Sequence, residues 1–215
     1  MLRRLKKDVL EELPPLTRAL VPLEVSGGGS LEELTRLAGF DPFALPVELD
    51  PLSIPFECVA EIRHELGRLK VEPALRFLLE QAEGYEEKTI VFAHHRAVLE
   101  ELANQLPGSI LVTGDTPLAD RQAAIERFRT DPELRFFCAS IMAMGVGIDL
   151  SSASRAVFVE SDWTPSILRQ AEDRLHRIGQ ARPVLIQYLV VPDSIDVNVL
   201  RAVLAKLEVI AEAIE

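Results

Sequence analysis

The 215-residue chain is long enough for one domain with a sizeable core plus an appendage, and 48% of its residues are hydrophobic. A formal net charge of -11 argues against a general basic nucleic-acid binder, so any DNA contact has to be a local patch. Cys58 and Cys138 form neither a metal-ligand spacing nor a disulfide framework. No apolar run approaches a membrane span and no apolar signal region follows the charged start, so we expect an intracellular protein, cytoplasmic or nucleoid-associated if bacterial.

The first 70 residues lack a regular rhythm of strands and helices. Residues 2–13 read as a basic amphipathic helix that two prolines end, and residues 20–25 read as a short extended segment. We therefore treat residues 1–25 as an arm. Residues 26–70 are a linker and variable helical region, opened by a glycine run at 26–30 that is typical of a flexible linker and follows no clear strand. Two short helices are expected there, at 31–37 and 59–69.

Residues 71–215 alternate between helices and strands. Strands are expected at 89–93, 109–113, 136–141, 156–159 and 184–191. Helices are expected at 72–83, 98–106, 118–129, around the arginines after residue 165, and at 195–214. This alternation predicts an α/β fold, with a mainly parallel sheet covered by helices on both faces. Ligands of such sheets meet the loops at the carboxyl ends of the strands, here after residues 92, 113, 141 and 159.

Two of these loops contain residues suited to phosphate or sugar. Gly114 and Thr116 precede a helix that contains Arg121, although Thr116 as a helix cap with Pro117 at the first position would account for them equally well. A free helix N-terminus is also a natural phosphate site. The loop after residue 141 has two glycines, Gly145 and Gly147, that let the backbone approach a ligand, although a tight turn without a ligand would use them too.

Arg174 and Arg177 lie three residues apart, so on a helix ended by Gly179 they would share one face. Two guanidinium groups that stay charged when desolvated suit a planar anion. For an isolated pair the commoner alternative is a surface helix whose arginines pair with Glu172 or Asp173.

The whole stretch 170–180 resembles the last helicase signature of the Swi/Snf-type (superfamily 2) DNA translocases, Q-A-x-D-R-x-x-R-x-G-Q, at every fixed position. Other segments carry the same resemblance. Residues 2–15 resemble the LRR-x-K-x-DVL-x-x-LP segment between the two motor lobes, residues 145–150 resemble G-x-G-[IL]-[ND]-L, and residues 163–165 resemble W-[NT]-P. The VFAHH run at 91–95 and the K-x-x-V-x-A-E-A ending resemble the HepA-related, annealing-helicase branch.

The resemblance implies the second RecA-like lobe of a DNA-dependent ATPase, a three-layer domain with an N-terminal helical arm. The implied catalytic residues are Arg174 and Arg177, as arginine fingers. The implied nucleotide-binding residues are Gly145, Gly147, Asp149 (where many relatives have Asn), Gln170 and Gln180. The implied DNA-binding residues are Gly114, Thr116, Arg121, Ser140 and Trp163, although a single tryptophan is more often part of a core. No metal-ligating residue is expected, because the pair His94-His95 has no third ligand nearby in sequence.

The implied cofactor is ATP with Mg, held mainly by a first lobe, and the implied partners are that lobe, in cis or in trans, and double-stranded or branched DNA. The chain has no G-x-x-x-x-G-K-[ST] phosphate cradle and no D-E-x-H pair, so we do not expect it to hydrolyse ATP alone. A cloned fragment, a split gene product and a natural stand-alone lobe all agree with these features. The alternative function is a non-catalytic module, derived from a helicase lobe, that binds protein or DNA.

Overall fold

The computed structural model describes residues 13–26, 56–84, 87–143, 148–192 and 194–212. The helix expected at 31–37 and both Gly145 and Gly147 lie outside these residues, as do nearly all of the glycine run and all but the last residue of the helix expected at 2–13. Within them, six strands form one sheet in the order β1-β6-β5-β2-β4-β3, and every pairing is parallel. The strands are β1 (Leu16–Pro22), β2 (Thr89–Ala93), β3 (Ser109–Val112), β4 (Phe136–Ser140), β5 (Arg155–Phe158) and β6 (Val184–Val190).

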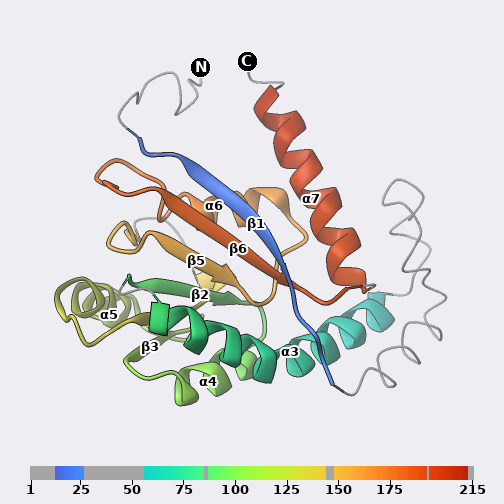
Figure 1. The fold of residues 1–215 in the computed structure, drawn as a ribbon, viewed down its shortest axis with the longest axis horizontal. Coiled ribbons are helices and arrows are strands. Elements are labelled where there is room, and N and C mark those ends of the chain that lie inside the picture. The colour runs from blue at the N-terminus through green and yellow to red at the C-terminus, as the bar shows by residue number, and fades with distance from the viewer. Residues whose placement is uncertain (1–12, 27–55, 85–86, 144–147, 193, 213–215) are drawn as a thin grey trace.

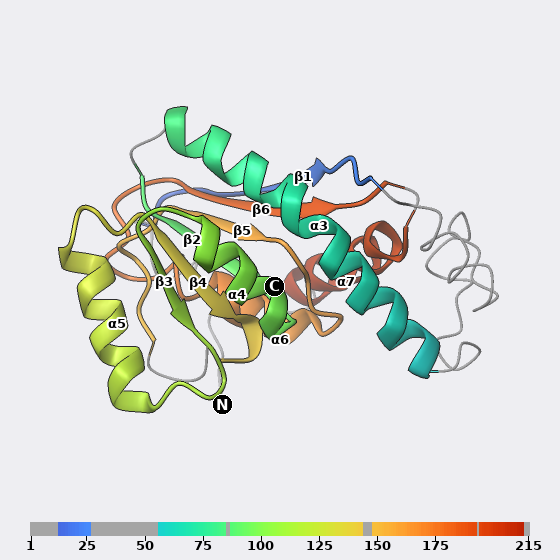
Figure 2. The same cartoon turned by 90° about the horizontal axis from the view of Figure 1, so that it is seen from below.

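Helices cover both faces of this sheet, which confirms the predicted three-layer α/β fold (Figure 1). They are α3 (Phe56–Gly84), α4 (Arg96–Gln105), α5 (Leu118–Thr130), α6 (Pro165–Glu172) and α7 (Ile195–Glu212), with a 3-10 turn, η1, at Ile141–Ala143. Residues of α3 and α4 pack on one face, and residues of α5, α6 and α7 pack on the other. In Figure 2, α3 and α4 lie in front of the sheet and α6 and α7 lie behind it.

The central strands are buried on both faces, as parallel strands between two helical layers must be. Along β2, Ile90 and Phe92 belong to one core cluster and Val91 and Ala93 to the other, and none of the four is exposed. Cys138 in β4 is also fully buried, which raises the pKa of its thiol to about 12.

The extended segment near the N-terminus is an edge strand of the same sheet. β1 pairs with β6 from Leu16 opposite Val184 to Pro22 opposite Val190. Pro22, which has no N–H to donate, stands at the end of this edge strand, where a proline is tolerated. Part of the predicted arm is therefore built into the sheet, beside the last strand of the chain.

Helices were expected at 59–69 and 72–83, and both segments are helical, but they are not two separate helices. The single helix α3 runs through both segments, with Pro73 inside it. A proline inside a helix removes one hydrogen bond and strains the preceding turn. Burial of Val71, Ala74 and Leu78 against the sheet offsets that cost and keeps the helix continuous. Among the described helices, none is both long and apolar enough to cross a bilayer.

Candidate nucleotide and DNA site

The arginine segment does not lie on a helix, which corrects the sequence expectation. α6 ends at Glu172, and residues 173–179 form turns and bends. The N–H of Arg174 donates to the carbonyl of Ala171, and the N–H of Leu175 donates to that of Glu172. In both bonds the donor lies three residues after the acceptor, as in a 3-10 turn, and not four residues after it, as in an α-helix. Gly179, with φ at 99°, reverses the chain several residues after the helix has ended.

Arg177 points toward the loop that follows η1. Its Nη1 donates to the carbonyl of Ile148 at 3.3 Å and lies 3.8 Å from Oδ2 of Asp149. The N–H of Leu150 donates to the carbonyl of Arg174 at 3.0 Å, so the same loop also contacts the first arginine. The structure therefore brings together three of the predicted residues, Arg174, Arg177 and Asp149.

Arg174 has an unused donor. Its Nε is buried and has no hydrogen-bond partner among the residues that the structure describes. Glu172, one of the two acids proposed as its partner, instead binds Arg18 and Tyr188. Buried donors are nearly always satisfied in folded proteins, so an unsatisfied guanidinium N–H is a feature that an anionic ligand would complete.

Asp149 is half-exposed and accepts a hydrogen bond from the N–H of Ser151 at 3.0 Å. Partial burial works to raise the pKa of Asp149, but the hydrogen bonds from Ser151 and the charge of Arg177 outweigh it. They hold the pKa below its ordinary value, so the side chain is a carboxylate at neutral pH. A carboxylate can accept a hydrogen bond from a hydroxyl and repels a phosphate.

The two glutamines differ in position. Gln170 is exposed on α6, whereas Gln180 is buried. The amide nitrogen of Gln180 donates to the carbonyls of Ser151, Ala153 and Leu175. Gln180 therefore ties the loop before β5 to the arginine segment, and a direct contact of either glutamine with nucleotide stays a prediction.

In the loop after β3, Thr116 does not cap the next helix, contrary to the capping alternative. Pro117 is the N-cap of α5, and no side chain caps this helix. The hydroxyl oxygen of Thr116 instead accepts the N–H of Thr113 at 3.0 Å, inside the turn. Gly114 is exposed, and a Cβ added there would meet nothing within 4 Å, so its backbone faces open space.

Arg121 connects two loops. Its guanidinium donates to the carbonyls of Gly114 at 2.6 Å, Thr116 at 2.7 Å and Ala143 at 3.0 Å. Ala143 ends η1, directly after β4, so one side chain holds the loop after β3 against the loop after β4. This internal role was not visible in the sequence, because the carbonyl of Ala143 is distant along the chain.

The remaining two DNA candidates lie at other strand ends. Ser140 is half-buried at the end of β4. Trp163 is half-buried and packs against the cluster of Ile62, Leu66, Val191 and Ile195, while the guanidinium of Arg63 lies 5.1 Å from its ring centroid. These contacts give Trp163 a packing role between α3 and α7.

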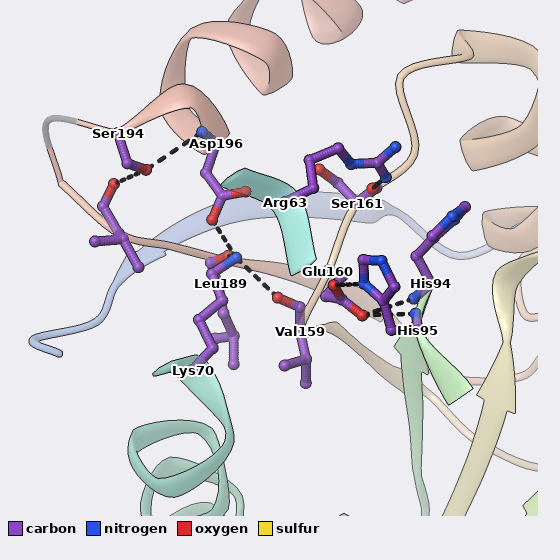
Figure 3. A network of polar contacts seen from close by, with 11 residues as sticks. Arg63, Lys70, His94, His95, Val159, Glu160, Ser161, Leu189, Ser194 and Asp196 are labelled. Atoms are coloured by element: carbon purple, nitrogen blue, oxygen red, sulfur yellow. Dashed lines mark hydrogen bonds and ion pairs between the residues drawn. The ribbon is translucent and has the colours of Figure 1, made fainter. Parts of the chain in front are cut away.

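A buried polar network beyond β5 was missed by the sequence analysis (Figure 3). Glu160 accepts the backbone N–H groups of His94 and His95 at 3.0 and 2.8 Å, and Nδ1 of His95 lies 2.6 Å from its Oε1. Burial works to raise the pKa of Glu160, but the bonds from His95 outweigh it and hold the pKa below its ordinary value. An acid directly after an apolar strand was the available signal. Among the described residues, no group of three or more His, Cys, Asp or Glu is placed to hold a metal ion.

Comparison with known families matches residues 70–179, just over half of the chain, to the helicase conserved C-terminal domain. The chain belongs to this family. The match includes both arginines and every other predicted site residue except Gln180, which lies one position beyond it.

The relatives of this helicase C-terminal domain place it in the Swi/Snf-type branch. It is 32% identical to the SWI/SNF-related matrix-associated actin-dependent regulator of chromatin subfamily A-like protein 1 of Xenopus tropicalis, over 99% of this chain and 23% of that protein. It is 34% identical to the Caenorhabditis elegans homolog, over 99% of this chain and 31% of that protein. It is 28% identical to the human DNA annealing helicase and endonuclease ZRANB3, over 91% of this chain and 18% of that protein. The chain thus spans less than a third of each of these relatives.

One solved structure agrees with this placement, and a second agrees with the fold. The crystal structure of the C-terminal part of the Fun30 ATPase domain matches with a TM-score of 0.58 and 32% identity, over 62% of this chain and 44% of that one. The Sulfolobus solfataricus SWI2/SNF2 ATPase core in complex with dsDNA matches with a TM-score of 0.59 and 20% identity, over 88% of this chain and 44% of that one. The second likeness concerns the fold.

Proposed function

We propose that this helicase C-terminal domain works as the second lobe of a DNA-dependent ATPase and that Arg174 and Arg177 are its arginine fingers. The observation that carries the proposal is the buried Nε of Arg174, which has no partner among the described residues and lies in a turn that also holds Arg177. A turn outside regular structure can present both side chains to a ligand bound by another domain. Guanidinium groups would there neutralise the negative charge that develops during phosphoryl transfer.

The ligand of this site would be ATP with Mg, held mainly by a first lobe in cis or in trans. The metal-bound nucleotide would supply the phosphoryl group to be transferred. From this chain, Arg174 and Arg177 would contact the terminal phosphate, and Asp149 would accept a hydrogen bond from a ribose hydroxyl. Gly145, Gly147, Gln170 and Gln180 complete the proposed nucleotide side.

The DNA side would use the loops after β3, β4 and β5. Gly114 exposes its backbone, and Thr116 and Ser140 supply hydroxyl groups for phosphates. Arg121 would act by holding two of these loops together, because its guanidinium already donates to three carbonyls. Trp163 would link this edge to α3 and α7. The substrate would be double-stranded or branched DNA, and an intracellular location, cytoplasmic or nucleoid in a bacterium, is part of the proposal.

The test is complementation with a first lobe. The chain alone should show no DNA-stimulated ATPase activity, and addition or fusion of the first lobe of a Swi/Snf-type relative should produce that activity. Restored turnover supports the motor-lobe function. Failure of several first lobes to restore turnover, while the chain still binds DNA or a protein partner, would favour the alternative of a non-catalytic binding module.

A further inference from the structure

A partly buried ion pair joins the edge strand β1 to the last residue of α6. Nε and Nη2 of Arg18 donate to Oε1 and Oε2 of Glu172 at 2.7 and 2.6 Å. The hydroxyl of Tyr188 in β6 donates to Oε1 of the same carboxylate at 2.8 Å. Only 1% of the Glu172 side chain is exposed, against 42% of Arg18. Three charge-assisted bonds therefore fix the end of α6 to two strands.

A second contact joins the same region to the arginine segment. Nε2 of His176 lies 2.8 Å from the carbonyl oxygen of Pro14, which is four residues before Arg18. The N–H of Val184 donates to the carbonyl of Pro15 at 2.9 Å, so this stretch is itself tied to β6. Residues 14–18 thus contact the chain on both sides of Arg174, at positions 172 and 176.

The position of Glu172 matters because the turn after α6 is hydrogen-bonded to its backbone carbonyl. The N–H groups of Leu175 and His176 both donate to the backbone carbonyl of Glu172, each at 3.0 Å. The residue whose side chain is held by Arg18 is therefore also the acceptor for the turn that carries the two arginines. Since no helix continues through the turn, these bonds are among those that place the arginines.

Stability alone does not call for this arrangement. An apolar pair often stabilises a contact as well as a buried ion pair does, whereas a bidentate guanidinium–carboxylate pair fixes one relative orientation. We propose that Arg18, Glu172 and Tyr188 are positioning residues that set the placement of Arg174 and Arg177. This proposal rests on the proposed function, because it assigns the network to the same two arginines.

The first test uses the 215-residue chain alone and needs no turnover. Tyr188→Phe removes only the hydroxyl and keeps the ring, which stacks on Phe158 with centroids 4.7 Å apart. We expect amide hydrogen exchange at Leu175 and His176 to become roughly fivefold faster or more, the effect of one lost hydrogen bond. Glu172→Gln should show a larger effect. Unchanged exchange at both amides in folded Tyr188→Phe would overturn the proposal, even if Glu172→Gln fails to fold.

The matched control is Arg68→Met. Arg68 binds Glu65 with the same two-bond geometry, at 3.0 and 2.7 Å, but on the exposed surface of α3 and away from the arginine segment. Exchange at Leu175 and His176 should equal that of the parent in this variant. If Arg68→Met accelerates exchange there as much as Tyr188→Phe does, the effect is general loosening of the domain and the proposal fails.

The second test uses the motor assembled with a first lobe. Glu172→Gln should lower kcat by about 10-fold to 100-fold, the range for a small misplacement of a catalytic group, with little change in the KM for ATP or in DNA affinity. In an Arg174→Lys background, Glu172→Gln should lower kcat by a much smaller factor, because the guanidinium that Glu172 places is already gone. An equal loss in both backgrounds would contradict positioning. If Arg174 variants themselves keep full turnover, the proposed function fails, and the exchange experiment still decides the network.

Discussion

A single buried ammonium group joins four elements of the fold, and its removal should be costly. Lys70 on α3 is 1% exposed, and its Nζ donates to the carbonyls of Val159 and Leu189, each at 2.9 Å. The same Nζ forms an ion pair with Asp196 of α7 (Figure 3). Val159 follows β5, Leu189 lies in β6, and Asp196 lies in the first turn of α7. One charge therefore holds α3 against both strands and the last helix.

Lys70→Met keeps an unbranched side chain that is one atom shorter and removes all three polar contacts. Breaking one partner out of a buried ion pair costs about 3–5 kcal/mol. Asp196 is 16% exposed and can regain some water, so we expect the lower part of this range, about 3 kcal/mol. That is a large part of the roughly 5–15 kcal/mol by which a domain is stable.

The assay is urea unfolding followed by far-UV circular dichroism, with the free energy of unfolding extrapolated to water. Lys206→Met on the exposed side of α7 is the control and should change this free energy by less than about 0.5 kcal/mol. Asp196→Asn should cost less than Lys70→Met, because the lysine keeps its two carbonyl acceptors. A loss below about 1 kcal/mol for Lys70→Met would refute the claim that this ammonium holds the four elements together.

Three further predictions concern pH, a turn and DNA. Burial, and then the charge of Arg63, lower the pKa of His94 below its ordinary 6.5. Just below pH 6.5, the imidazole is therefore protonated more fully in the unfolded chain than in the folded one. Stability should fall as pH drops below 6.5, and thermal unfolding of His94→Gln should show a flatter dependence there. Gly108 has φ at 64° and an added Cβ would lie 2.1 Å from a backbone oxygen, so Gly108→Ala should lower the melting temperature far more than Gly84→Ala, which meets nothing. DNA binding by the chain alone, measured by fluorescence anisotropy, should be weak and independent of sequence, and its affinity should fall only slightly with salt. Arg121→Ala should weaken this binding further, because it releases two loops. Tight, sequence-selective binding would contradict this prediction.

The layered fold was predictable because its signals are local. Each buried strand is an apolar run with helical spacing after it, and the parallel sheet follows from that alternation. The positions of the loops at the carboxyl edge follow in turn. The continuity of α3 through Pro73 was not predictable, because it depends on packing against a sheet formed by distant residues.

The site was predictable in its residue types and less so in its geometry. The signature at 170–180 identified the arginines, but α6 ends at Glu172, whose side chain binds Arg18 and Tyr188 in distant strands. Arg121 was expected to contact DNA, yet its guanidinium is occupied by three carbonyls. In both cases the deciding partners are far away in sequence, where spacing carries no information.

The most direct test of the account is the turnover of alanine variants at Arg174 and Arg177 in a motor completed with a first lobe. An arginine finger contributes about 10³ to 10⁵ in rate, so we predict a collapse of ATPase turnover with DNA affinity nearly unchanged. Lysine should rescue poorly, because it keeps the charge and loses the planar fork. Alanine at the exposed Arg127 of α5 is the control and should leave turnover intact. Turnover within about twofold of the parent in either alanine variant, or unfolding of the domain, would contradict the assignment.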